Sequence, residues 1–377
     1  MKIKRFIMKD IVEKLKTSHK AVILYGPRQA GKTTLCKDII KTMSVKTLYI
    51  NADEARYIEV LSSRDARQLS DLVSGYQLVV IDEAQRVPDI GINLKILIDA
   101  GLGVKILATG SSSFDLANKV QEPLTGRHWT YFLYPISHLE LRQHFNRFEM
   151  SAALEERLVW GSYPELFSLA GRETKATYLR TLTSDYLYKD ILALADIRHA
   201  GKIRDLLKLI AFQVGNQASL SELASSLDMS KETVARYIDL LEQSFVIFRL
   251  GGFSRNLRKE ISKTHKYYFY DVGVRNGIIE NFQPLSLRND VGALWENFLL
   301  AERLKRNAYL GNFTTPYFWR TYTGAEIDYI EERSGELSGY EFTWGAKHKS
   351  VPPSWNATYK QATWQAVDRN TWIDFVV

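Results

Sequence analysis

The chain has only one cysteine, Cys36, among its 377 residues. A single cysteine excludes an internal disulfide and every zinc site that is built from several cysteines. The seven histidines are scattered along the chain, and no two of them form an H-x-x-x-H pair. We therefore expect no structural metal in this protein.

Long apolar runs are missing as well. No stretch approaches the ~18 consecutive apolar residues that a membrane-spanning helix needs. The first ten residues, Met1 to Asp10, lack the apolar core of a secretory signal. We expect a soluble, cytoplasmic protein that does not associate with a membrane.

The remaining composition is that of a globular protein, with 45% apolar and 25% charged residues. The length suits two or three domains of about 100–200 residues each. The net charge is +7, and residues 249–266 contain six basic side chains against one acidic side chain. Such a cluster could neutralise several phosphates of a nucleic acid, although a solvated loop would show the same composition.

Short apolar runs alternate with helix-length segments in the first third of the chain. Continuous apolar runs rich in β-branched residues are typical of strands that are buried on both faces and joined by crossover helices. The pattern predicts an α/β domain with a parallel sheet over residues 1–150. The runs cover 21–25, 46–50, 78–81, 104–108 and 129–133.

A glycine-rich segment follows the first apolar run and matches the pattern G-x-x-x-x-G-K-[ST] completely. Its glycines allow backbone N–H groups to surround phosphates at a helix N-terminus. Lys32 would reach the outer phosphates, and Thr33 would offer a hydroxyl group to Mg²⁺. We predict that this loop binds ATP with Mg²⁺ through Gly26, Pro27, Arg28, Gln29, Ala30, Gly31, Lys32, Thr33 and Thr34.

An acidic pair, Asp82 and Glu83, ends the third apolar run. Proteins with a phosphate-binding loop hold Mg²⁺ and place a catalytic base at this position. We assign Asp82 to the metal, together with Thr33, and Glu83 to activation of the attacking water.

Three further polar residues are catalytic candidates. Thr109 and Ser111 follow the fourth apolar run and would emerge at the same sheet edge as the acidic pair. A polar residue here senses the γ-phosphate in phosphate-loop ATPases with an additional strand, although serines at this place also cap helices. Arg127 would contact phosphate in its own chain or in a neighbouring subunit, unless it is a solvated loop residue.

These motifs together resemble those of the prokaryotic AAA+ ATPase family of the archaeal-ATPase type. The resemblance covers nearly the whole chain and implies an AAA+ fold, ATP hydrolysis and a C-terminal domain of uncharacterised role. It also implies assembly into a ring-like homo-oligomer such as a hexamer. The segments that carry it are Tyr25–Thr34, Ile81–Gln85, Thr109–Ser112, Leu124–Arg127, Trp160–Glu165, Tyr188–Asp190, Tyr268–Asp271 and Leu294–Phe298.

A helical lid or linker is expected over 151–205, and the spacing over 206–266 predicts a winged helix. Ser219 opens one short helix with a capping box, and Ser230 caps a second helix. Basic residues of that second helix and of the following wing could contact DNA. Because acidic residues share the second helix, a protein-docking or structural module remains the alternative. The DNA-binding candidates are Lys231, Arg236, Arg255, Arg258 and Lys259.

Three carboxylates in residues 267–377, Glu296, Asp328 and Glu341, follow the order found in restriction-endonuclease-like nucleases, whose fold this region resembles. Those enzymes place a lysine two residues after the last carboxylate, where this chain has Thr343. Lys347 and Lys349 come later and would serve only if the chain folded back. We therefore expect an α+β nuclease-like domain with a degenerate site.

The leading prediction is an ATPase that acts on DNA, such as branched or junction DNA, as an oligomeric motor or switch. The first alternative is a nucleotide-dependent regulatory switch that binds a protein partner. The second alternative is an ATP-dependent nuclease whose cutting requires Asp328.

Overall fold

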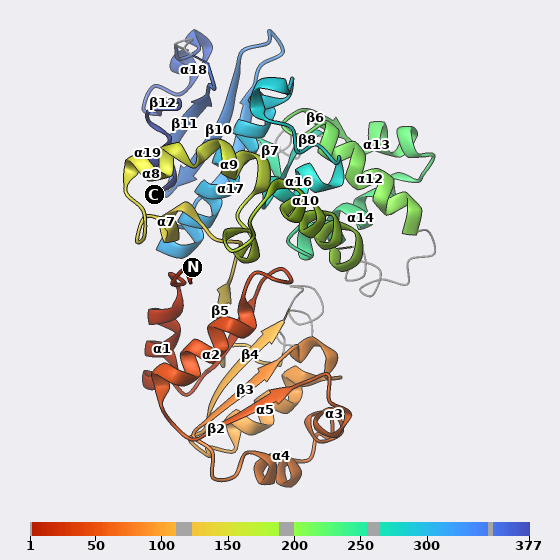
Figure 1. The fold of residues 1–377 in the computed structure, drawn as a ribbon, viewed down its shortest axis with the longest axis vertical. Helices are drawn as coiled ribbons and strands as arrows, with labels where there is room; N and C mark the ends of the chain where they lie inside the picture. Colours follow the sequence, from red (N-terminus) through yellow and green to blue (C-terminus); the bar gives the residue numbers. More distant parts are fainter. Residues whose placement is uncertain (1, 111–122, 188–199, 255–263, 346–349) are drawn as a thin grey trace.

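A computed structural model of the chain describes residues 2–110, 123–187, 200–254, 264–345 and 350–377. The chain forms two sheets, one of five strands and one of seven, each accompanied by helices (Figure 1). Several residues singled out in the sequence lie outside the described ranges, namely Ser111, Arg255, Arg258, Lys259, Lys347 and Lys349.

The five-stranded sheet is parallel and has the strand order β2-β3-β4-β1-β5. Every residue of β1 and β3 is buried, as the continuous apolar runs predicted. The α/β domain with a parallel sheet is therefore confirmed, and β4 is the additional strand between β1 and β3. The strands are β1 (Ala21–Tyr25), β2 (Thr47–Asn51), β3 (Leu78–Asp82), β4 (Lys105–Gly110) and β5 (His128–Phe132).

Helices connect these strands as crossovers. Asp65 caps α4 by accepting hydrogen bonds from the backbone N–H groups of Arg67 and Gln68. No side chain caps α2, which begins directly after Gly31. The helices of this half are α1 (Met8–Thr17), α2 (Lys32–Met43), α3 (Ala55–Leu61), α4 (Ala66–Val73), the 3₁₀-helix η1 (Ala84–Arg86) and α5 (Ile90–Asp99).

The seven-stranded sheet is mixed and has the order β12-β11-β10-β9-β7-β8-β6. Parallel pairing of β7 with β9 joins the strands of 206–266 to those of the C-terminal part. The boundary expected between 266 and 267 falls inside β8, so the residues on its two sides share one sheet. The strands are β6 (Gln217–Ser219), β7 (Ile247–Gly252), β8 (Thr264–Phe269), β9 (Thr315–Arg320), β10 (Glu326–Arg333), β11 (Glu336–Phe342) and β12 (Thr363–Val367).

Two helices of the C-terminal half begin where the sequence predicted. The hydroxyl groups of Ser219 and Ser230 accept hydrogen bonds from the N–H groups of Glu222 and Thr233, which start α13 and α14. The described helices are α7 (His138–Leu141), α8 (Arg147–Ala152), α9 (Leu154–Trp160), η2 (Pro164–Phe167), α10 (Arg172–Thr181), the π-helix η3 (Leu182–Leu187), α12 (Ala200–Phe212), α13 (Leu220–Leu227), α14 (Lys231–Gln243), α16 (Val272–Ile278), η4 (Leu285–Leu287), α17 (Val291–Leu310), α18 (Pro353–Thr358) and α19 (Trp372–Val376).

Aromatic side chains pack where the two halves meet. Tyr134, which follows β5, stacks on Tyr270 with the ring centroids 5.6 Å apart. Tyr309, near the end of α17, is buried in the core of the first half. The long helix α17 therefore reaches from the second sheet to the phosphate-loop domain. Within the described ranges, no helix combines the length and the apolar character needed to span a bilayer.

Candidate nucleotide-binding site

The phosphate-binding loop connects β1 to α2, and both of its glycines are required by their surroundings. A Cβ atom on Gly26 would collide with the carbonyl oxygen of Leu133. Gly31 has a φ of +99°, a conformation that other residues rarely adopt. Because no side chain caps α2, its first-turn N–H groups form a site suited to an anion such as phosphate.

Lys32 is buried within this loop. Its ammonium group donates hydrogen bonds to the carbonyl oxygens of Gly26 at 2.8 Å and Pro27 at 3.0 Å. These bonds hold the positive charge against the loop in which phosphates would lie. The position agrees with the phosphate-binding role predicted for Lys32.

Asp82 accepts hydrogen bonds from three hydroxyl groups. Its Oδ2 accepts from Thr33 Oγ1 at 2.7 Å and from the Tyr49 hydroxyl at 2.6 Å, and its Oδ1 accepts from Thr109 Oγ1. Burial alone would raise the pKa of Asp82, but these three bonds and the charge of Lys32 outweigh burial and lower it. The carboxylate therefore stays negatively charged beside the loop.

Glu83 lies half-buried next to Asp82, with a φ of 58°. Its backbone N–H donates to Thr109 Oγ1 at 3.3 Å, and the Gln85 amide donates to its carboxylate. Thr109 thus contacts both acidic residues. The structure brings Thr33, Asp82, Glu83 and Thr109 to the carboxyl edge of the sheet, where the sequence had placed them.

Thr33 and Asp82 are the protein groups that fit a magnesium ion accompanying a nucleotide. Magnesium in such sites is held by one or two protein side chains together with phosphate and water oxygens. No group of three His, Cys, Asp or Glu side chains suited to a metal occurs in the described part of the chain. A hydroxyl–carboxylate pair beside a phosphate loop needs no third protein ligand.

Arg127 lies at the other end of the sheet. It directly precedes β5, and its carbonyl oxygen accepts a hydrogen bond from the N–H of Ala21, the first residue of β1. The phosphate loop begins beyond the opposite end of β1, about 16 Å away at ~3.3 Å per residue. Arg127 pairs instead with Asp99 at 2.8 Å. Contact with a nucleotide of its own chain was therefore a wrong expectation, and contact in a neighbouring subunit stays a prediction.

Two polar residues near the loop, Tyr49 and Arg5, were not predicted. Tyr49 lies on β2 inside an apolar run, and its hydroxyl points to Asp82 on the neighbouring strand. Arg5 precedes α1 and donates to the carbonyl oxygen of Ala30 within the loop. Neither residue belongs to a motif, so only their position in space reveals their partners.

The three carboxylates of the C-terminal half lie on α17, β10 and β11, and they form no metal-binding group within the described residues. Asp328 on β10 and Glu341 on β11 each directly adjoin the register pair of Tyr329 and Tyr340. Burial and, to a smaller extent, the negative charge of Asp328 raise the pKa of Glu296 on α17. Asp328 also accepts a hydrogen bond from the backbone N–H of Phe342 at 2.8 Å.

A lysine lies among these carboxylates, but it comes from β8. Lys266 Nζ is 2.6 Å from Glu326 Oε1 and 3.4 Å from Glu296 Oε1. Its side chain is 4% exposed, so Lys266 does not belong to the solvated basic cluster in which the sequence had placed it. Burial raises the pKa of Glu296 to about 7, although the charge of Lys266 lowers it. Lys266 precedes all three carboxylates in the chain, whereas the lysine of restriction-endonuclease-like nucleases follows the last one, so the motif did not predict it.

The exposed face of α14 carries both signs of charge. Lys231 and Arg236 are exposed, as predicted, and Val234, Ile238 and Leu241 are buried. The neighbouring Arg249 on β7 forms ion pairs at 3.1 Å with both Asp239 and Glu242. Part of the positive charge beside α14 is therefore already neutralised.

Comparison with protein families places three known domains on the chain. An AAA domain matches residues 18–142, and two domains of unknown function, DUF8612 and DUF4143, match 151–285 and 291–362. The uncharacterized protein Rv2008c of Mycobacterium tuberculosis is 31% identical over 88% of this chain and 71% of its own length. The chain belongs to this family of prokaryotic AAA ATPases with a C-terminal domain of unknown function.

A second relative also bears only the name uncharacterized protein. A protein of Haemophilus influenzae is 23% identical over 84% of this chain and 80% of its own. Among solved structures, the Thermotoga maritima RuvB Holliday junction branch migration motor covers 66% of this chain and 90% of its own, with 15% identity and a TM-score of 0.32. AMPPCP-bound DnaA from Aquifex aeolicus has 17% identity and a TM-score of 0.30, over 63% of this chain and 86% of its own. Scores this low carry no argument about function.

Proposed function

We propose that the protein binds and hydrolyses ATP with Mg²⁺. The observation that carries the proposal is the hydrogen-bonded group of Thr33, Asp82 and Thr109 beside a phosphate loop with an uncapped helix N-terminus. A buried carboxylate next to a hydroxyl group on α2 suits a divalent cation that accompanies phosphate.

Each residue of the site has a role in this proposal. Lys32 and the loop N–H groups bind the phosphates, and Thr33 and Asp82 hold the magnesium ion. Bound magnesium would offset the negative charge that develops on the transferred phosphoryl group. Glu83 removes a proton from the attacking water, and Thr109 keeps both acidic residues in place.

Substitution of Glu83 by glutamine tests the hydrolytic half of this proposal. The amide keeps the shape of the side chain but does not accept the proton, so ATP should still bind while turnover falls by about 100-fold or more. Glu54→Gln, at an exposed position in the same half of the chain, is the matched control. Turnover of Glu83→Gln within a few-fold of the wild type would place the base elsewhere.

We further propose that the protein binds DNA through a winged helix formed by residues 206–266 and uses ATP hydrolysis to act on that DNA. The arrangement of α13, α14 and the antiparallel strands β6, β8 and β7 supports this proposal. So do the exposed side chains of Lys231 and Arg236. The proposed ring-like homo-oligomer would let Arg127 contact the nucleotide of a neighbouring subunit.

The test is ATP turnover with and without duplex, single-stranded and branched DNA, together with DNA affinity at several salt concentrations. Each phosphate contact that is removed should reduce the slope of log affinity against log salt by about 0.9. The triple substitution of Arg255, Arg258 and Lys259 by alanine should therefore flatten the slope. Arg249→Ala, which removes an ion-paired arginine, is the control.

A regulatory switch that binds a protein partner is the second candidate. The acidic Asp239 and Glu242 beside Arg249 favour it, because they weaken the positive field next to α14. Slow ATP turnover that no DNA changes would support this candidate over DNA binding.

We also propose that the C-terminal carboxylates do not cleave DNA. Lys266 is engaged with Glu326 and Glu296, and no lysine stands at position 343. Incubation of ATPase-active protein with linear, circular and branched DNA in Mg²⁺ or Mn²⁺ should leave the DNA intact. Cleavage that disappears in Asp328→Ala would overturn this expectation.

A further inference from the structure

Arg5 contacts four separate parts of the molecule from a position before α1. Its Nη1 donates to the carbonyl oxygen of Ala30 at 2.6 Å, and its Nε donates to Glu140 Oε1 at 2.8 Å. Its Nη2 donates to the carbonyl oxygen of Tyr134 and, at 3.3 Å, to the hydroxyl of Tyr309. The side chain is 8% exposed. One buried guanidinium therefore links the N-terminal segment to the phosphate loop, to Glu140 of α7, to Tyr134 and to α17.

The bond to Ala30 bears directly on the phosphate loop. In a trans peptide, the carbonyl group and the following N–H group point in opposite directions. Because Arg5 holds the Ala30 carbonyl on one side, the Gly31 N–H must point to the other side. Gly31 has no Cβ atom and tolerates several backbone conformations, so its peptide would turn easily without such a bond.

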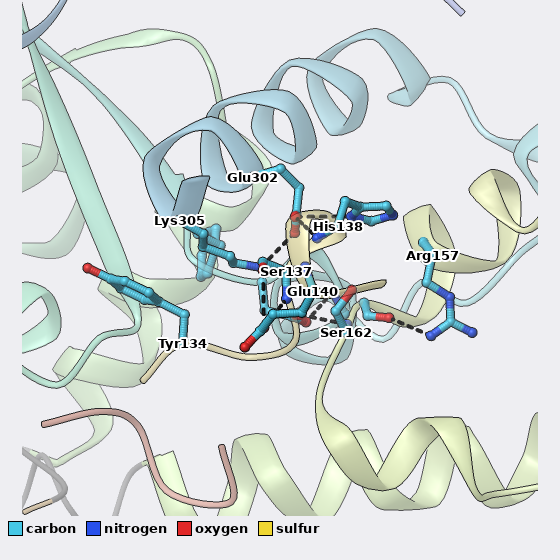
Figure 2. A network of polar contacts seen from close by, with 12 residues as sticks. Tyr134, Ser137, His138, Glu140, Arg157, Ser162, Glu302 and Lys305 are labelled. Atoms are coloured by element: carbon cyan, nitrogen blue, oxygen red, sulfur yellow. Dashed lines mark hydrogen bonds and ion pairs between the residues drawn. The ribbon is translucent and has the colours of Figure 1, made fainter. Parts of the chain in front are cut away.

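Glu140 in turn holds Arg5. Its carboxylate is fully buried and also accepts hydrogen bonds from the N–H groups of Phe6 and Ser137. Burial alone would lower the pKa of Arg5, but the charge of Glu140, together with Tyr309 and the hydrogen bonds to both residues, raises it, so the guanidinium remains positive. Figure 2 shows Glu140 and Ser137 close together on the segment that forms α7.

Helix α17 supports the same arrangement from the C-terminal half. The Tyr309 hydroxyl contacts Arg5 and also accepts a hydrogen bond from the N–H of Tyr134 at 3.2 Å. One turn and two turns earlier on this helix, Lys305 and Glu302 form an ion pair at 2.7 Å. Glu302 also accepts a hydrogen bond from the N–H of His138 on α7 at 2.7 Å (Figure 2).

We propose that Arg5 is a positioning residue of the nucleotide site, which holds the Ala30 carbonyl so that the Gly31 N–H faces the bound phosphates. The proposal rests on the proposed ATP binding. A simpler alternative is a clamp that only attaches the N-terminal segment to the rest of the fold. The two roles predict different binding data, because a clamp changes the amount of folded protein whereas a positioning residue changes affinity.

Calorimetric titration with ADP and Mg²⁺ separates the two roles, since it yields both the dissociation constant and the number of sites per chain. Arg5→Ala should weaken ADP affinity by about 10-fold or more, as expected for the loss of a charge-assisted hydrogen bond, with the number of sites unchanged. Low-millimolar guanidinium should restore part of the affinity, and the same concentration of sodium chloride should not. Lys4→Ala, which removes the neighbouring exposed charge, should bind like the wild type.

Two further variants separate the contribution of the Ala30 bond from those of the charge of Arg5 and of its contact with α17. Arg5→Lys retains the charge opposite Glu140 but lacks the forked donors, so its affinity should lie between those of Arg5→Ala and the wild type. If Arg5→Ala does not fold, Arg5→Lys takes its place in the titration. Tyr309→Phe removes the contact with α17 and leaves the Ala30 bond, so ADP affinity should change by less than about threefold.

Three results of the titration would overturn the inference. Unchanged affinity with fewer sites per chain in the Arg5 variants would show a clamp and overturn the inference. Wild-type affinity and a full number of sites in Arg5→Ala would overturn it as well. A wild-type protein that binds no ADP would overturn the proposed function and the inference together.

Discussion

The two carboxylate sites of this chain contain the same kinds of groups in opposite proportions. At the nucleotide site, a single buried carboxylate, Asp82, accepts hydrogen bonds from three hydroxyl groups and lies near the ammonium of Lys32. In the C-terminal half, a single ammonium group, Lys266, forms ion pairs with Glu296 and Glu326. The first site surrounds one carboxylate with hydroxyl donors, and the second places one lysine between two carboxylates.

This difference sets the charge of each carboxylate. The donors around Asp82 lower its pKa despite burial. Burial and the nearby Asp328 raise the pKa of Glu296 to about 7, although Lys266 opposes them. Asp82 therefore keeps a negative charge that could attract the magnesium ion of a bound nucleotide. In the C-terminal half, Glu296 and Glu326 share the cation of Lys266.

Removal of the lysine from the C-terminal cluster should have the largest effect. Lys266→Met leaves Glu296 and Glu326 without their shared cation. Breaking a buried ion pair from one side costs about 3–5 kcal/mol, so we expect the free energy of unfolding to fall by that amount near pH 7.5. Urea unfolding measures it, with exposed Lys208→Met as the control. A loss below about 1 kcal/mol would show that the carboxylates do not depend on Lys266.

Removal of the lysine from the nucleotide site should change binding more than folding. Lys32→Ala deletes a buried cation that would meet phosphate charge, at a cost of about 3 kcal/mol, or roughly 100-fold in nucleotide affinity. The measurement is equilibrium binding of ATP and ADP, and Lys37→Ala on the exposed side of α2 is the matched control. Wild-type affinity in Lys32→Ala would remove the phosphate-binding role of this residue.

The pH dependence of stability should expose the raised pKa of Glu296. Its ordinary pKa is 4.5 and its value in the fold is about 7, so the folded chain holds a proton that the unfolded chain has released between these pH values. Unfolding free energy should therefore fall as pH rises from 4.5 to 7. Glu296→Gln should remove this part of the decline and be about 1–3 kcal/mol more stable than the wild type above pH 7.

The control for that experiment is Glu336→Gln, at an exposed position on β11. Its pH profile should run parallel to that of the wild type. A Glu296→Gln profile with the same slope as the wild type would show that Glu296 is ionised throughout this range.

The smallest expected effect is that of Tyr49→Phe, which removes one of the three hydroxyl donors to Asp82. Thr33 and Thr109 remain, so the cost should be about 0.5–1.5 kcal/mol, which corresponds to a change of roughly 2- to 10-fold in the kcat/KM for ATP. Tyr76→Phe, a half-buried tyrosine away from the site, serves as the control. A loss as large as that in Lys32→Ala would mean that Tyr49 contacts the nucleotide itself.

Much of the first half could be predicted because its signals are local. All five strands fall within one or two residues of the predicted apolar runs. The phosphate loop follows β1, and the acidic pair and Thr109 lie at the carboxyl ends of β3 and β4, which parallel strands bring to one edge of the sheet. The caps at Ser219 and Ser230 depend on residues three positions away, so they too were visible in the sequence.

The remaining features depend on residues that are far apart in the chain. Arg127 seemed close to the nucleotide because it follows the other motifs in order, but it lies at the amino end of β5. Lys266 seemed part of a basic surface because its sequence neighbours are basic, but it lies against carboxylates of α17 and β10. The pairing of β7 with β9 likewise has no local signal.

The sequence by itself determined the parallel sheet, the phosphate loop and the order of the acidic residues, because strand burial and loop chemistry are encoded within short segments. Only the tertiary structure decided which cation accompanies each carboxylate and that Arg5 donates a hydrogen bond to the phosphate loop. Arg5 and Tyr309 are 304 residues apart, and Lys266 and Glu296 are 30 residues apart. Such contacts depend on how strands and helices pack, and no spacing rule along the chain describes them.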